Sequence, residues 1–121
     1  TINLEAFKIP TDQTLIIELA GGIMVPLNDS QTNLDLIKHL NLPVILVSKN
    51  YLGSLNHTLL SFELLQQHGI PMAGIVFNGP ENPSGEKFIL NHTGLPLILR
   101  VHTEEELNEA VIASYADKIH V

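Results

Sequence analysis

Residues 43–48 read PVILVS and residues 72–78 read MAGIVFN, and these two apolar runs decide the fold. Neither run alternates regularly with polar residues, which is typical of strands buried on both faces of a parallel sheet. A helical pattern lies between them, from Ser54 to His68, with Leu55, Leu59 and Phe62 spaced by four and three residues. The stretch therefore predicts two parallel strands joined by a crossover helix.

The same alternation extends along the rest of the chain. Two further strands are predicted at Thr14–Glu18 and Pro96–Val101, and three further helices at Asn33–Leu40, Gly85–His92 and Thr103–Ala116. We therefore expect an α/β fold, with a parallel sheet flanked by helices on both faces, in a single domain spanning residues 1–121. The segment 79–85 is expected to be a loop at the ligand-binding edge, either a connector or a lid.

Two helix ends carry clear signals. Gly69 suits a left-handed residue after the long helix, and Pro71 prevents its continuation. Thr103 and Glu106 match a capping box, which predicts that the last helix begins at residue 103.

The composition limits the possible functions. The 121 residues carry a formal net charge of −7, and only six residues are Lys or Arg, which argues against nucleic acid or an anionic membrane as the main partner. There is no cysteine, so disulfides and thiolate chemistry are excluded. Hydrophobic residues make up 45%, which is ample for a buried core. We expect a cytoplasmic protein.

Glu18 ends the first predicted strand and is followed closely by Gly21 and Gly22. A carboxylate at this edge of an open α/β sheet supplies a hard oxygen that suits Mg²⁺, and glycines let backbone N–H groups approach a ligand. The alternative for Glu18 is a solvated or helix-capping acid, and for the glycines an ordinary turn.

The start of the long helix is a second candidate site. Gly53 and Ser54 stand where a helix exposes unpaired N–H groups, which attract a carboxylate or a phosphate. The alternative is simple capping by Ser54. Lys49, at the end of the preceding strand, either neutralises an anion or is merely solvated.

Asn78 ends the third predicted strand, and its amide can pair with the edge of adenine. The alternative is a turn-forming asparagine. The six histidines show no metal-ligand spacing and are interpreted as structural or solvent-facing.

Taken in order, four segments resemble dethiobiotin synthetase. They are Glu18-Leu19-Ala20-Gly21-Gly22 with Val25-Pro26-Leu27, then residues 42–47 (LPVILV), then residues 52–60 (LGSLNHTLL), then residues 69–78 (GIPMAGIVFN). The match runs from about residue 12 to residue 78 and resembles the C-terminal half of that family's domain.

The resemblance implies a P-loop NTPase-like fold and a homodimeric carboligase of biotin synthesis that depends on ATP and Mg²⁺. Such an enzyme carboxylates 7,8-diaminopelargonic acid with CO₂, phosphorylates the carbamate and closes a cyclic urea. By position in the motifs, Glu18 would be a Mg²⁺ ligand and Asn78 an adenine contact. The Ala20, Gly21 and Gly22 backbone would line the diamine and carbamate pocket. The substrate carboxylate would be bound, across the dimer, by Leu52, Gly53, Ser54, Leu55 and Asn56.

Three departures from the family pattern qualify this prediction. Leu19 replaces a glycine beside Glu18, and Leu99-Arg100-Val101-His102 replaces the usual strand-ending Gly-x-Ile-Pro, so no adenine contact is carried over there. The Gly-x-x-x-x-Gly-Lys-Ser/Thr phosphate loop does not occur in the 121 residues, and we assign no catalytic residue. We expect the C-terminal half of a dethiobiotin synthetase that is inactive alone. The alternatives are a non-catalytic dimerisation or regulatory domain and half of another P-loop amidoligase.

Overall fold

The computed structural model describes residues 1–119, which form parts of two compact units, Thr1–Leu42 and Pro43–Val121. Within the described residues, no helix is long and apolar enough to cross a membrane.

The first unit contains a short 3-10 helix, η1 (Leu4–Ala6), and one α-helix, α1 (Asn33–Leu40), whose bounds match the prediction. The Asp35 carboxylate accepts the backbone N–H of Thr32 at 2.8 Å, which closes the start of α1. Asn41, with φ 52°, ends the helix in the left-handed conformation that asparagine tolerates.

The predicted strand at Thr14–Glu18 is wrong. Residues 14–18 form no regular element, and their side chains are exposed, with Ile16 at 91%. A strand exists only where a neighbour completes its hydrogen bonds, and no other strand pairs with this segment among residues 1–119.

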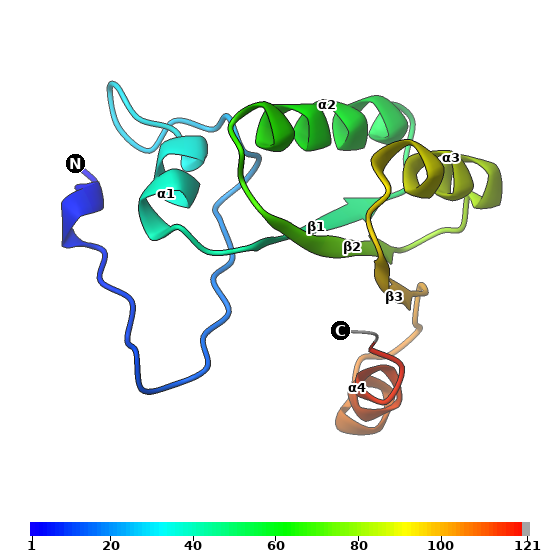
Figure 1. The fold of residues 1–121 in the computed structure, drawn as a ribbon. Helices are drawn as coiled ribbons and strands as arrows, with labels where there is room; N and C mark the ends of the chain where they lie inside the picture. Colours follow the sequence, from blue (N-terminus) through cyan, green and yellow to red (C-terminus); the bar gives the residue numbers. More distant parts are fainter. Residues whose placement is uncertain (120–121) are drawn as a thin grey trace. The chain divides into compact units, whose positions relative to one another are not determined.

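The second unit is an α/β structure that confirms the predicted fold class (Figure 1). Its elements, in chain order, are β1 (Val44–Lys49), α2 (Ser54–Gln67), β2 (Met72–Asn78), α3 (Pro83–Thr93), β3 (Leu97–Val101) and α4 (Glu109–Ala116). The three strands are parallel and lie in the order β1-β2-β3. Each of these strands matches a predicted strand to within one residue at either end.

The core of this unit lies between the sheet and its two middle helices. Ile75 and Phe77 of β2 and Ile89 of α3 are at most 2% exposed, and Leu46 of β1 and Leu59 of α2 pack against them. Figure 1 shows α2 and α3 on the same side of the sheet, and α4 on the other side, beyond β3.

Helices are expected on both faces of the sheet, but only α4, near β3, lies on the face opposite to α2 and α3. On β1, Ile45 and Val47 alternate with the less exposed Leu46 and Ser48 and remain 50% and 62% exposed. No strand pairs with the outer edge of β1 among residues 1–119.

The predicted start of the last helix is also wrong, because α4 begins at Glu109 rather than near Thr103. The side chain of Asn108 accepts the N–H of Val111 at 3.0 Å and caps the helix there. Glu104 accepts the Tyr115 hydroxyl proton instead of serving a helix start. By contrast, α3 is longer than predicted, because Asn82 caps it and Pro83 opens its first turn.

Candidate functional site

The carboxyl ends of the three strands lie in register at one edge of the sheet. Lys49 of β1 pairs with Asn78 of β2, and Asn78 pairs with Val101 of β3. Ligands of open α/β sheets bind beyond this edge. A ligand-binding site is therefore expected at the loops that follow these residues.

The loop after β1 leads directly into the start of α2. Gly53 is the N-cap residue with φ 94°, a left-handed conformation that favours glycine. Ser54 is the first helical residue rather than the cap, and its hydroxyl accepts the N–H of Tyr51 at 3.2 Å. The N–H groups of Leu55 and Asn56 meet no acceptor among the described residues. The start of α2 thus offers two aligned donors and the positive end of the helix dipole.

This geometry brings together the five residues predicted to bind a carboxylate. Gly53 has open space around it, and Leu52 and Leu55 are exposed, so a ligand can reach the donors. Their role in binding a carboxylate stays a prediction.

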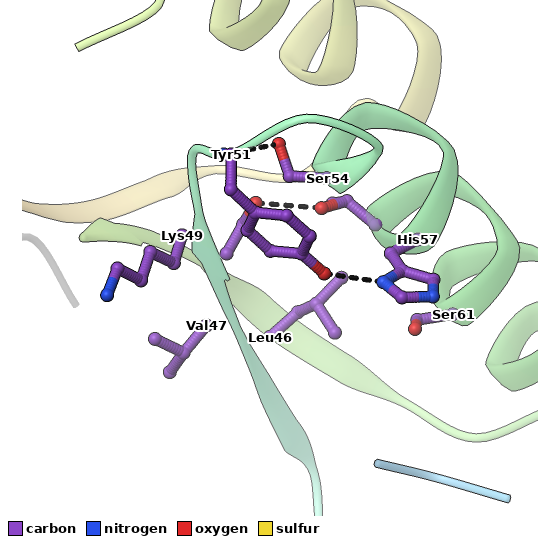
Figure 2. Close-up of a pocket in the computed structure, with 9 residues that line it drawn as sticks. Leu46, Val47, Lys49, Tyr51, Ser54, His57 and Ser61 are labelled. Atoms are coloured by element: carbon purple, nitrogen blue, oxygen red, sulfur yellow. Dashed lines mark hydrogen bonds between the residues drawn. The ribbon is translucent and has the colours of Figure 1, made fainter. Parts of the chain in front are cut away.

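A pocket of about 200 Å³ lies beside the start of α2, between that helix and β1 (Figure 2). Tyr51 and His57 lie at its rim, where the Tyr51 hydroxyl and His57 Nδ1 share a hydrogen bond of 2.5 Å. Ser48 and Thr58 close its floor with a buried hydroxyl–hydroxyl bond of 2.7 Å. The lining residues are Leu46, Val47, Ser48, Lys49, Tyr51, Ser54, His57, Thr58 and Ser61.

Sequence reasoning missed the Tyr51–His57 pair and treated His57 as structural or solvent-facing. Six residues separate the two side chains, and the loop before α2 brings them together. Six residues is not a helical repeat, so no periodicity in the sequence signals this pair. Lys49 lines the pocket and is exposed, so both interpretations of this lysine, as an anion partner and as a solvated side chain, stay predictions.

Asn78 is exposed at the end of β2, and its side chain makes no hydrogen bond within residues 1–119. Its amide is therefore available to a ligand, which suits the predicted adenine contact. The next residue, Gly79, turns the chain with φ 87° and donates its N–H to the Val101 carbonyl at 2.9 Å.

In the first unit, the side chain of Asn33 holds the loop that carries three predicted site residues, Ala20, Gly21 and Gly22. Asn33 is 1% exposed, and its amide donates to the carbonyl oxygens of Ala20 at 3.0 Å and Gly22 at 2.8 Å. Gly21 between them has φ 82°, which favours glycine. The loop is thus held in one shape by a buried side chain that sequence reasoning did not single out.

Glu18 precedes this loop and is exposed. Mg²⁺ in nucleotide sites takes one or two carboxylates and completes its shell with phosphate oxygens and water. A single exposed carboxylate fits one position of such a shell. Among residues 1–119 no group of three His, Asp or Glu side chains could hold a metal by itself. The role of Glu18 as a metal ligand stays a prediction.

Comparisons with known proteins identify the relatives of this chain. The model of a family described as an AAA domain matches residues 1–111. The ATP-dependent dethiobiotin synthetase of Cytophaga hutchinsonii is 48% identical over 120 residues, which are 98% of this chain and 58% of the relative. That of Christiangramia forsetii is 46% identical over 118 residues, covering 97% of this chain and 56% of the relative.

A more distant synthetase, from Paramagnetospirillum magneticum, is 37% identical over 113 residues, or 93% of this chain and 55% of that protein. The chain thus spans little more than half the length of these curated relatives. The chain therefore belongs to the AAA domain family, and its expected resemblance to the dethiobiotin synthetases is confirmed.

Proposed function

We propose that this chain forms part of an ATP- and Mg²⁺-dependent dethiobiotin synthetase, a carboligase of biotin synthesis. The substrates would be 7,8-diaminopelargonic acid and CO₂ or bicarbonate. One amine would attack CO₂ to give a carbamate, ATP would phosphorylate the carbamate, and the second amine would close the cyclic urea with loss of phosphate. The similarity to the three synthetases supports the family, and the start of α2 supports this substrate class.

The single observation that carries the proposal is the pair of free donors at the start of α2. A linear diamine acid carries its carboxylate at one end, far from its amines. The N–H groups of Leu55 and Asn56, with the helix dipole, suit that carboxylate and leave the amines to reach elsewhere. We propose that this helix start serves the partner subunit of a cytoplasmic homodimer.

The remaining roles follow the resemblance. Asn78 would contact adenine, and the Ala20–Gly22 backbone would line the pocket for the diamine and the carbamate. Glu18 would supply one oxygen ligand to Mg²⁺, which when bound would neutralise phosphate charge. Because residues 1–121 hold no phosphate loop, we propose that turnover requires such a loop from the same protein or from another chain.

A substitution at Asn56 tests the carboxylate site. Asn56→Asp changes no side-chain volume and places a negative charge beside the free N–H groups, where the helix dipole tolerates it. We expect the affinity for the diamine acid to fall at least about tenfold through like-charge repulsion, while ATP affinity is unchanged. Calorimetric titration of the chain with each ligand measures both.

Gln66→Glu is the matched control, because it adds the same charge to the exposed end of the same helix. It should leave the affinity for the diamine unchanged. Unchanged diamine affinity in Asn56→Asp would remove the start of α2 as the carboxylate site. If the chain binds neither the diamine nor ATP even when it is joined to a segment that carries a phosphate loop, the alternative of a non-catalytic dimerisation or regulatory domain replaces the enzyme.

A further inference from the structure

An ion pair lies beside the turn that follows Asn78 and is not part of the predicted site. Arg100 of β3 and Glu86 of α3 are in contact, with Arg100 Nη2 3.2 Å from Glu86 Oε1. Their side chains are only 15% and 14% exposed. The cost of removing both charges from water offsets much of their attraction. The main effect of such a pair is therefore to fix the positions of the groups that it contacts.

The guanidinium of Arg100 also holds the backbone of the turn that follows Asn78. Nη2 donates to the Gly79 carbonyl at 2.9 Å, and Nη1 donates to the Val101 carbonyl at 2.8 Å. The Val101 carbonyl also accepts the N–H of Gly79 at 2.9 Å. Both peptide groups of Gly79 are thereby tied to the end of β3.

The carboxylate of Glu86 extends the same network to the loop after β1. Its Oε1 accepts a hydrogen bond of 2.6 Å from Asn50 Nδ2, and the same nitrogen donates to the Pro80 carbonyl at 2.8 Å. The backbone N–H of Asn82 also donates to this oxygen, at 3.3 Å. The loops after β1 and β2 and the end of β3 thus meet at a single carboxylate.

We infer that Glu86 and Arg100 are positioning residues that orient Asn78 for recognition of the adenine base. Among residues 1–119 the Asn78 side chain has no hydrogen-bond partner, so its direction is set by its backbone and by the fixed turn at Gly79 and Pro80. This inference rests on the proposed function, because it assumes that Asn78 contacts adenine. Selectivity for adenine over guanine depends on the angle of that amide, since a bidentate pair is strict in geometry.

The discriminating measurement is the ratio of the dissociation constants for Mg·GTP and Mg·ATP. Titration of the isotope-labelled chain with each nucleotide, followed by amide NMR shifts, gives both constants even when binding is weak. In wild type we expect a ratio of roughly ten or more in favour of ATP, and in Asn78→Ala a ratio near one. Glu86→Gln should lower the ratio several-fold, because an amide no longer attracts Arg100 as an anion does.

Two further variants separate positioning from general structural damage. In the Asn78→Ala background, Glu86→Gln should leave the ratio unchanged, whereas loss of structure would weaken both nucleotides in either background. Arg100→Lys keeps the charge but loses the planar fork that spans the Gly79 and Val101 carbonyls, so it should act like Glu86→Gln. It also serves as the test if Glu86→Gln does not fold.

Glu81→Gln is the matched control, because this carboxylate lies in the loop just before α3, is 57% exposed and pairs with His102 outside the network. It should keep the wild-type ratio. A wild-type ratio in both Glu86→Gln and Arg100→Lys would overturn the positioning role and leave the proposed function standing. A ratio unaffected by Asn78→Ala would overturn both the adenine contact and the positioning role.

Discussion

Gly74 has no room for a side chain where β2 passes β3. A Cβ atom at this position would lie 2.6 Å from the Pro96 carbonyl oxygen and 2.7 Å from Ile98 Cγ1. Real Cβ atoms do not approach backbone oxygens so closely, and the carbonyl cannot withdraw because it accepts the N–H of Ile75 at 3.0 Å. The two strands would have to separate.

We therefore expect Gly74→Ala to lower the free energy of unfolding by about 1–3 kcal/mol. Urea denaturation followed by circular dichroism measures the change. Gly22→Ala is the control, since a Cβ atom there meets nothing within 4 Å and the backbone φ is not left-handed. Equal stability of the two variants would show that β2 and β3 accommodate the extra atom.

At the scale of residues, the sequence identifies side chains whose role depends on their place in an element. Asn78 ends a strand and Gly53 begins a helix, and both places are visible in the local pattern. Asn33 and Arg100 act on loop carbonyls 11 to 21 residues away. Their role depends on which segments the fold brings together, and no local spacing records it.

At the scale of elements, an aromatic side chain, Tyr115, joins α4 to the segment that follows β3. The Tyr115 hydroxyl accepts the N–H of His102 at 3.0 Å and donates its proton to Glu104. The hydrogen bond to Glu104 raises the pKa of the Tyr115 phenol, and burial adds to the effect. The protonated phenol is the form that the folded state favours.

The raised pKa of Tyr115 makes the stability of the folded state depend on pH. A phenol whose pKa is raised by folding binds its proton more tightly in the folded state, so its contribution is complete below the usual phenol pKa of about 10. That contribution is lost as the pH rises through the raised pKa. We expect ultraviolet titration of Tyr51→Phe, in which Tyr115 is the remaining tyrosine, to give a pKa above the usual value.

Glu104→Ala in the same background removes the acceptor and should return the phenol toward its usual pKa. A phenol in Tyr51→Phe that titrates at its usual value would mean that Tyr115 does not donate to Glu104 in solution.

The contrast between α4 and the other elements shows what local patterns can predict. Met72–Asn78 is predicted to the residue, because an apolar run between a glycine-proline turn and a polar loop has one interpretation. The capping box predicted at Thr103 is not used, because Glu104 contacts Tyr115 and Asn108 caps α4 instead. The Thr14–Glu18 run has the composition of a strand, but a strand forms only where a neighbouring strand completes its backbone hydrogen bonds.

At the scale of the whole molecule, one edge of the sheet is both apolar and open. Val47 on β1 is 62% exposed, and within residues 1–119 no strand pairs with the outer side of β1. Open apolar edges favour pairing with another chain, and lysine on an edge strand opposes it. We expect Val47→Lys to reduce the concentration-dependent self-association of the chain by sedimentation analysis, with no loss of thermal stability.

Ile112→Lys provides the control, because Ile112 is 61% exposed but lies on α4, away from any strand edge. It carries the same change in charge and nearly the same loss of exposed apolar surface. An equal effect of both substitutions would attribute the association to net charge rather than to the edge of β1.

The order of strands in the sheet has a consequence for how the protein is made. Because β1, β2 and β3 are neighbours in the order in which they occur along the chain, β2 and β3 each leave the ribosome when their earlier neighbour is already synthesised. The sheet can grow by one strand and one crossover at a time, without waiting for a distant segment to close a long loop. β1, as the first of these three strands to be made, waits longest for its neighbours, so a chaperone that recognises nascent chains has most to protect there.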